Sequence, residues 1–201
     1  MDAAVLIPVK RFTAAKRRLA GLLEAGPRAE LARWLAGRVV DAARPSPVFV
    51  ACDDDAVATW ADSVGAEVLW SPGLGLNGAV DAGRSTIAGK GHDHLVIVHS
   101  DIPLAHDLGT MARAGTVTLV PDRRRAGTNV LALPVTAPVP ASYGSGSFTR
   151  HLRLAMQAGY RVEVRVDPLL ALDVDNPDDL THPLLVHRLP QWLQTILASR
   201  R

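Results

Sequence analysis

Short, almost continuously apolar runs recur along the chain, and segments with helical periodicity separate them. Runs of this kind are typical of parallel β-strands that are covered on both faces. The expected strands cover residues 3–9, 48–52, 67–70, 94–99, 116–120, 130–133 and 161–166. In the last of these, charged residues alternate with valines, which indicates a position near an edge of the sheet.

Amphipathic segments between these runs predict helices, and glycines follow three of them as stop signals. The expected helices cover residues 28–43, 54–64, 77–88, 104–114, 147–158 and 189–198. The Pro-rich stretch 134–140 indicates a surface loop. The alternation of strand and helix predicts an α/β fold with a doubly wound, mostly parallel sheet. No linker is evident, so we expect residues 1–201 to form a single domain.

The composition narrows the classes of partner. The chain of 201 residues is 48% hydrophobic, which is enough for one sizeable core. Its net charge of +2 is too small to indicate nucleic acid or an anionic membrane as a partner. The single cysteine, Cys52, allows no internal disulfide. The apolar run 3–9 lacks a preceding basic segment and is too short for a membrane helix, so we expect a first strand and a cytoplasmic location.

Basic residues gather where a ligand is expected. In doubly wound sheets, ligands bind beyond the carboxyl ends of the strands. Lys10, Lys16, Arg17 and Arg18 follow the first expected strand and could neutralise a polyphosphate. Basic residues are unfavourable at a helix N-terminus unless an anion is bound there. Taken alone, these four residues fit a solvated basic surface equally well.

Three aspartates are candidate magnesium ligands. Asp101 follows the fourth expected strand, and Mg²⁺ is usually held by one or two carboxylates together with water and substrate phosphate. Taken alone, an Asx-turn or helix cap is the more frequent role of such a residue. Asp173 and Asp175 alternate along the chain and share one face, where they repel each other unless a cation lies between them. Asp175 could instead cap a helix that begins near Pro177.

Two further segments have the small residues of a phosphate-binding loop. Residues 127–129 read Gly-Thr-Asn, and residues 143–148 read Tyr-Gly-Ser-Gly-Ser-Phe before an expected helix. Small residues let backbone N–H groups reach an anion at a helix N-terminus. A flexible surface loop with an ordinary serine cap is the alternative interpretation.

Residues 73–78 spell G-x-G-x-x-G, the pattern of a dinucleotide-binding loop. The pattern follows the third expected strand, whereas a dinucleotide-binding loop normally follows the first. After this pattern, no acidic residue except Asp101 ends a next strand as a ribose ligand would, and a metal explains Asp101 better. His94 and His99 fall on opposite faces of one strand, so we interpret them as core or surface histidines.

Taken together, these motifs resemble the CofC/FbiD-type guanylyltransferases, which have a MobA-like nucleotidyltransferase fold. The resemblance covers nearly the whole chain. It rests on residues 6–10 (LIPVK), 14–19 (AAKRRL), 75–77 (GLN), 100–103 (SDIP), 127–129 (GTN), 143–148 (YGSGSF) and 172–175 (LDVD). Arg17 departs from the family pattern, which often has a small residue there.

The resemblance implies transfer of GMP from GTP to phosphoenolpyruvate or 2-phospho-L-lactate, with release of pyrophosphate, in biosynthesis of the deazaflavin coenzyme factor 420. It also implies Mg²⁺ as cofactor, with Lys16 and Asp101 as catalytic residues. The implied nucleotide-binding residues are Lys10, Lys16, Arg18, Gly75 and Asn77; the acceptor-binding residues are Thr128, Gly144 and Ser147; the metal ligands are Asp101, Asp173 and Asp175. A homodimer is an expectation from relatives with this fold.

Three alternatives remain beside this interpretation. A molybdopterin or sugar-phosphate nucleotidyltransferase is disfavoured because Pro8-Val9-Lys10 replaces the usual Gly-rich loop after the first strand. A non-catalytic regulatory module of the same fold is disfavoured by the presence of Lys16 and the three aspartates. An NAD-dependent oxidoreductase is disfavoured by the position of the Gly-rich pattern. The acceptor stays open between phosphoenolpyruvate, 2-phospho-L-lactate and 3-phosphoglycerate, and the composition leans towards phosphoenolpyruvate.

Overall fold

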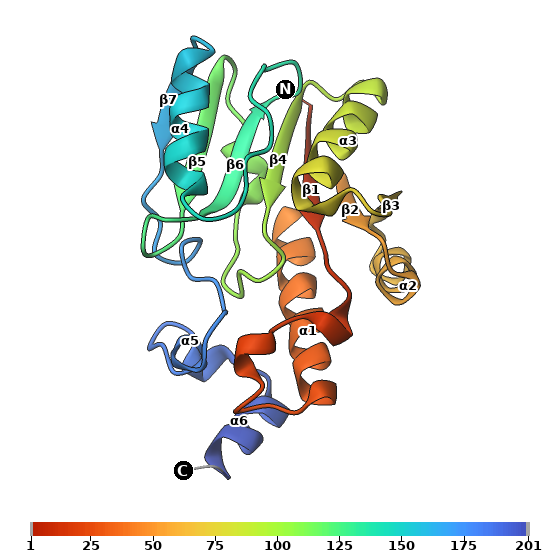
Figure 1. Ribbon diagram of the computed structural model, residues 1–201, viewed down its shortest axis with the longest axis vertical. Coiled ribbons are helices and arrows are strands. Elements are labelled where there is room, and N and C mark those ends of the chain that lie inside the picture. Colours follow the sequence, from red (N-terminus) through yellow and green to blue (C-terminus); the bar gives the residue numbers. More distant parts are fainter. Residues whose placement is uncertain (1, 200–201) are drawn as a thin grey trace.

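The computed structural model describes residues 2–199, and this part of the chain forms one seven-stranded sheet (Figure 1). The strands are β1 Ala3–Pro8, β2 Val48–Cys52, β3 Glu67–Trp70, β4 His94–Val98, β5 Thr116–Pro121, β6 Thr128–Pro134 and β7 Arg161–Val164. Their order across the sheet is β3-β2-β1-β4-β6-β5-β7. Only β6 runs antiparallel to its neighbours among these described strands, which confirms the expectation of a mostly parallel sheet. The edge position expected for the last strand is also confirmed.

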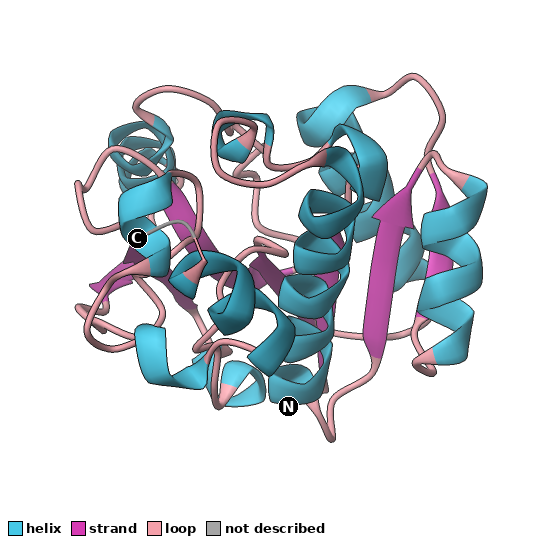
Figure 2. Ribbon diagram, turned by 90° about the horizontal axis from the view of Figure 1, so that it is seen from below, coloured by secondary structure: helices cyan, strands magenta, loops and turns pink. Residues whose placement is uncertain are grey.

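Helices cover both faces of the sheet, as Figure 2 shows. On one face lie α1 (Ala25–Ala43) and α2 (Asp55–Ser63), and on the other lie α3 (Gly75–Gly89) and α4 (Ser147–Gln157). In β1, Val5 and Ile7 pack on the first face while Ala4 and Leu6 pack on the second, because side chains alternate along a strand. Burial on both faces explains why the central strands are almost continuously apolar.

The helix α3 approaches β1 closely at Gly83. A Cβ atom at this position would lie 3.0 Å from the Leu6 side chain and 3.3 Å from Leu69. Glycine therefore lets α3 pack closely against the sheet. This packing helps to place the N-terminus of α3 near the carboxyl ends of the strands.

The C-terminal segment folds back onto α1. The short helices α5 (Pro177–Leu180) and α6 (Gln191–Ala198) lie near the first half of α1 in Figure 1. Leu31 and Leu35 of α1 share an apolar cluster with Leu172, Val174 and Leu193. This packing brings residues 172–175 to the carboxyl ends of the parallel strands. No helix within residues 2–199 is long and apolar enough to cross a bilayer.

The prediction of a helix at residues 104–114 is wrong. The structure has only a 3₁₀ turn, Leu108–Met111, in this segment. Asp107 precedes the turn with a φ of 48°, in the left-handed region, and an α-helix cannot continue through such a residue. The apolar residues that suggested a helix, among them Leu104 and Leu108, are buried in clusters beneath the sheet.

The expected surface loop at residues 134–140 is present, since residues 135–140 have no regular structure and Thr136, Pro138 and Pro140 are exposed. The loop is nevertheless anchored, because Ala137 and Val139 are fully buried against the face of the sheet that α3 covers. The guanidinium of Arg84 on α3 donates to the carbonyl oxygens of Val135 at 2.7 Å and Val139 at 2.9 Å, and also to that of Ala137. One side chain thus satisfies three carbonyl groups of a loop without regular structure, which allows the loop to lie against the sheet.

We expect Arg84→Ala to lower the free energy of unfolding by about 3 kcal/mol or more, because it leaves three carbonyl groups without their donor. Urea denaturation followed by circular dichroism measures this change. Arg153→Ala, an exposed arginine on α4, is the matched control and should change stability by less than about 0.5 kcal/mol. Equal stabilities of the two variants would contradict the role of Arg84.

Candidate active site

A cavity of about 630 Å³ opens at the carboxyl ends of β1, β2 and β4. The cavity lies beside β1 and β4, between which the strand order reverses. Doubly wound sheets bind ligands at this position. Four segments supply the wall together with Ala32 and Asp175: residues 8–18 after β1, residues 51–53 at the end of β2, residues 71–79 around the start of α3, and residues 99–101 after β4.

The segment after β1 is anchored by an aromatic contact. Phe12 is buried in the 3₁₀ turn Phe12–Ala14, and its ring meets Trp60 edge to face with centroids 5.3 Å apart. The guanidinium of Arg33 lies 5.2 Å from the centre of the same ring. This packing holds the start of the basic segment against α1 and α2, so its later residues border the cavity.

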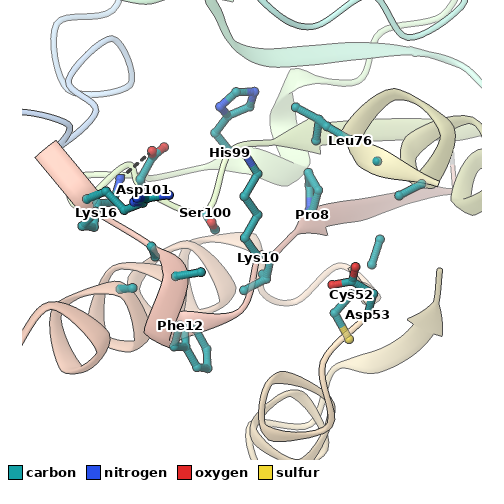
Figure 3. A pocket seen from close by; sticks show the side chains of 18 of the residues that line it. Pro8, Lys10, Phe12, Lys16, Cys52, Asp53, Leu76, His99, Ser100 and Asp101 are labelled. Atoms are coloured by element: carbon teal, nitrogen blue, oxygen red, sulfur yellow. Dashed lines mark hydrogen bonds and ion pairs between the residues drawn. The ribbon is translucent and has the colours of Figure 1, made fainter. Parts of the chain in front are cut away.

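Lys16 turns its side chain into the protein. Its φ of 53° places it in the left-handed region, just before the 3₁₀ turn Arg17–Leu19. The Nζ atom donates to Asp101 Oδ2 at 2.7 Å and lies 3.5 Å from Asp175 Oδ1 (Figure 3 shows the pair with Asp101). Arg18 adds a contact of 3.2 Å to the other oxygen of Asp175. Asp101 and Asp175, distant in sequence, therefore meet at one ammonium group.

The charges at this point stabilise one another. Burial alone would lower the pKa of Lys16, but the nearby carboxylates of Asp101 and Asp175 outweigh it and raise the pKa. Burial alone would raise the pKa of Asp101, but the positive charge of Lys16 outweighs it and lowers the pKa. Both groups are consequently charged at neutral pH, and the ammonium of Lys16 occupies a position that suits a cation.

Asp173 lies in the field of the other two carboxylates. Burial, followed by the negative charges of Asp101 and Asp175, raises the pKa of Asp173 to about 6. Residues 172–175 form no strand, but the expected alternation is present, since Leu172 and Val174 are buried while Asp173 and Asp175 are partly exposed. The two aspartates therefore do lie on one face, although Asp173 does not border the cavity.

Asp175 does not cap the helix α5, which was its alternative expected role; the neighbouring residue Asn176 does. Asn176 is the N-cap of α5, and the carboxylate of Asp179 accepts N–H bonds from Asp175 at 2.8 Å and Asn176 at 2.7 Å. Arg123 pairs with the second oxygen of Asp179. The backbone at residue 175 is thereby fixed, and its carboxylate is left to contact Lys16 and Arg18.

The donor set is suited to a hard divalent cation that is shared with substrate. Oδ1 of Asp101 is buried and has no hydrogen-bond partner in residues 2–199. No group of three or more His, Cys, Asp or Glu side chains in the described part of the chain is arranged to hold a metal ion by itself. Mg²⁺ typically needs only one or two carboxylates when substrate phosphates and water complete its shell. The observed arrangement fits that requirement.

The residues expected to bind the nucleotide separate into two groups. Lys10, Lys16, Arg18 and Gly75 border the cavity. Asn77 does not border it; its Oδ1 accepts from the Tyr143 N–H at 2.7 Å and its Nδ2 donates to the Tyr143 carbonyl at 3.3 Å. In this structure Asn77 connects the start of α3 to residues 141–146, so it positions a loop.

The three residues expected to bind the acceptor lie outside the cavity wall. Thr128 and Ser147 are buried and adjacent, because the Ser147 hydroxyl accepts from the Thr128 N–H at 3.1 Å. The Thr128 hydroxyl lies 3.0 Å from Nδ1 of His151, whose Nε2 accepts from the Ser142 N–H at 3.0 Å. Nδ1 therefore carries the proton and donates to Thr128. Gly144 is exposed, with a φ of 119°.

Two residues on the cavity wall were missed from the sequence. His99 borders the cavity, and burial lowers the pKa of its imidazole, so the ring is neutral near pH 7. Asp53 follows β2 and also borders the cavity, and it was not among the expected site residues. Applying the strand-end rule to β2, as was done for β1 and β4, would have found Asp53.

Comparison with known proteins assigns the fold and the chemistry to one family. The family model described as "Guanylyl transferase CofC like" matches residues 3–192. The chain belongs to this family. It is 36% identical to the phosphoenolpyruvate guanylyltransferase of Rubrobacter xylanophilus, over 90% of this chain and 92% of that one. It is 34% identical to the enzyme of the same name from Chloroflexus aggregans, over 88% and 94% of the two chains. The chain is therefore a nucleotidyltransferase.

Solved structures agree on the fold. A protein of Desulfovibrio desulfuricans G20 assigned to the nucleotide-diphospho-sugar transferases superposes with a TM-score of 0.77 at 17% identity, covering 98% of this chain and 94% of its own. A nucleotidyl transferase of Methanothermobacter superposes with a TM-score of 0.62 at 15% identity, covering 96% and 98%. The expected nucleotidyltransferase fold is confirmed.

The buried His151 makes the stability of this family member depend on pH. Burial, followed by the charge of Arg150, lowers the pKa of His151 to about 4, so the unfolded chain binds more protons between pH 4 and about 6.5. Stability that is fully present above pH 6.5 is lost as the pH falls, by about 2 kcal/mol between pH 7 and pH 5. Urea denaturation at a series of pH values, with His151→Gln beside the wild type, measures this difference.

The variant should show a flatter dependence on pH by that amount. His187→Gln, which changes an exposed histidine, should keep the wild-type slope. Identical slopes in the wild type and His151→Gln would show that His151 is not buried as a neutral group.

Proposed function

We propose that the protein transfers GMP from GTP to phosphoenolpyruvate and releases pyrophosphate, as a step in biosynthesis of the deazaflavin coenzyme factor 420. The relatives named phosphoenolpyruvate guanylyltransferase, which cover most of the chain, support the donor and the acceptor. The observation that carries the proposal is the position of the buried Lys16 between Asp101 and Asp175, on the wall of a cavity at the switch point of the sheet.

The reaction needs charge neutralisation more than it needs a base. A phosphate oxygen of the acceptor attacks the α-phosphorus of GTP, a new P–O bond forms, and the bond from the α-phosphorus to the bridging oxygen breaks as pyrophosphate leaves. The attacking phosphate is already ionised, so no side chain has to remove a proton. Catalysis then consists of alignment and of stabilising the developing charge on the phosphates.

Lys16 is suited to bind those phosphates. Its raised pKa keeps it protonated, and its ammonium is held in place before substrate arrives. Lys10 and Arg18 border the same cavity and add positive charge for the triphosphate. Lys10 is exposed and extends into the cavity in Figure 3. A polyphosphate that enters the cavity thus meets three cations from one segment of the chain.

Asp101 and Asp175 would hold Mg²⁺, with Asp173 beside them. Bound Mg²⁺ supplies Lewis-acid stabilisation of the phosphate oxygens. The unpartnered Oδ1 of Asp101 and the raised pKa of Asp173 both indicate that these carboxylates lack positive charge when only Lys16 is present. Thr128, Gly144 and Ser147 remain our proposal for the acceptor side; in this structure Thr128 and Ser147 contact each other, so their part would be to shape the loop around the acceptor.

Pyrophosphate release tests the reaction. We expect release with GTP, Mg²⁺ and phosphoenolpyruvate, and much less with ATP or CTP as donor or with 2-phospho-L-lactate or 3-phosphoglycerate as acceptor. Chelation of the metal should stop the reaction. Because the product is labile, the enzyme that consumes it should be included as a coupling partner. No release from a folded sample with any of the three acids would refute the proposed activity.

Asp101→Asn tests the assignment of the metal site. The substitution keeps the shape of the side chain but removes its charge, so we expect kcat to fall at least about 100-fold. Asp62→Asn, which changes an exposed aspartate on α2, is the matched control and should retain wild-type kcat. Thermal melts of both variants establish that they are folded. A folded Asp101→Asn enzyme with full activity would remove Asp101 from the site.

A further inference from the structure

The cavity has two chemically different ends. Lys10, Lys16 and Arg18 with Asp101 and Asp175 form a charged end, on the side of β4. Away from this end the wall is mostly apolar, beside the buried Ser71, and comes from the ends of β1 and β2 and the start of α3. Its small or aliphatic residues are Pro8, Ala51, Leu76 and Ala79. A nucleotide that places its phosphates at the charged end therefore places its base at the apolar end.

One charged group stands at the apolar end. Asp53 directly follows β2, borders the cavity and is exposed to solvent. In Figure 3 its carboxylate points into the cavity, on the side opposite Lys16 and Asp101. The side chains of Asp53 and Asp101 follow strands that are two positions apart in the sheet, a separation of roughly 10 Å. A nucleoside monophosphate unit can span such a distance.

Asp53 has no structural role that would explain a carboxylate. No hydrogen bond or ion pair joins its side chain to another residue in the described part of the chain. The neighbouring Asp54 performs both local functions: it caps α2 by accepting the Val57 N–H at 3.2 Å, and it pairs with Arg11 at 2.9 Å. A free carboxylate at the apolar end of a cavity therefore has its hydrogen-bonding capacity available for a ligand.

Guanine is the base whose edge matches a carboxylate. Its N1–H and N2–H groups are adjacent donors, and a carboxylate can accept from both in a bidentate pair. Adenine and cytosine present one donor beside an acceptor at the corresponding edge, and uracil presents a single donor between two carbonyl groups. A carboxylate at this position would accept two bonds from guanine and would repel the lone pairs of the other bases.

We infer that Asp53 reads the guanine base, as the residue that determines the specificity of the enzyme for its nucleotide donor. The inference rests on the proposed function in that it assumes a nucleotide in this orientation. The apolar wall of Pro8, Leu76 and Ala79 would contact the faces of the ring, while Asp53 pairs with its edge. Gly75 then helps to shape the apolar end of the cavity. Base recognition is shared between the segment after β2, which holds Asp53, and the segment after β3, which holds Gly75.

Asp53→Asn tests this role through a change of specificity. The amide offers one acceptor and one donor, so it loses the match to guanine and gains a match to xanthine, which has a carbonyl oxygen in place of the 2-amino group. We expect kcat/KM for GTP to fall roughly 10- to 100-fold and that for xanthosine triphosphate to rise above the wild-type value. The KM for the acceptor acid should stay unchanged. Asp55→Asn, an exposed aspartate in the first turn of α2, is the matched control and should behave as the wild type.

Equilibrium binding of GTP, xanthosine triphosphate and ATP, measured by calorimetry without acceptor, separates this inference from the proposed function. A wild-type protein that binds GTP preferentially but transfers no GMP to any of the three acids would refute the proposed acceptors, while the Asp53 variants would still test base recognition. Equal weakening of all three nucleotides in Asp53→Asn would assign the carboxylate to the ribose and overturn the inference. An unchanged ratio of GTP to xanthosine triphosphate, or a wild type that binds no purine nucleotide, would overturn it as well.

Discussion

The structure depends on one buried ammonium group. Lys16 is taken out of water, and only the carboxylates of Asp101 and Asp175 offset that desolvation. These residues lie 85 and 159 positions from Lys16 in the sequence. The same contact therefore closes the segment after β1, fixes the end of β4 and holds the returning C-terminal segment against the sheet. Docking of the C-terminal segment therefore adds a second carboxylate to the pair of Lys16 and Asp101, and apolar packing on α1 supports the same segment.

This arrangement divides the sheet into two working halves. The half made of β1, β2 and β3, with α3 above it, supplies an apolar wall and cations at opposite ends of one cavity. The other half, from β4 to β7, supplies carboxylates and a buried polar network around Thr128 and His151. The two halves meet between β1 and β4, where the strand order reverses. A reaction that joins two anionic molecules needs such a division, with cations on the line between them.

The sequence was sufficient for the parts that depend on local pattern. The apolar runs located the strands, because burial on both faces demands them, and the strand-end rule found Lys16 and Asp101. Other parts depend on distant contacts that no local pattern records. The loop at residues 134–140 is anchored against the sheet because Arg84, about fifty positions earlier, satisfies its carbonyl groups. Asn77 faces a loop rather than the cavity because Tyr143 lies beside it. The helix expected at residues 104–114 is absent, and the left-handed backbone of Asp107 that interrupts it has no signal in the local pattern.

The reversed direction of β6 has an evolutionary consequence. Because β6 runs antiparallel to β4, the segment that enters it, residues 122–127, lies at the same edge as the exits of β1 and β4. Its neighbours in the chain are joined to that edge by the bond from the His99 N–H to the Asn129 carbonyl at 3.1 Å. Changes in the length or composition of this entry segment would alter the surroundings of Thr128, which we propose for the acceptor side, while the first three strands and their cavity wall stay intact. Under that proposal, a sheet of this kind can accept different acceptors without a change in its donor site.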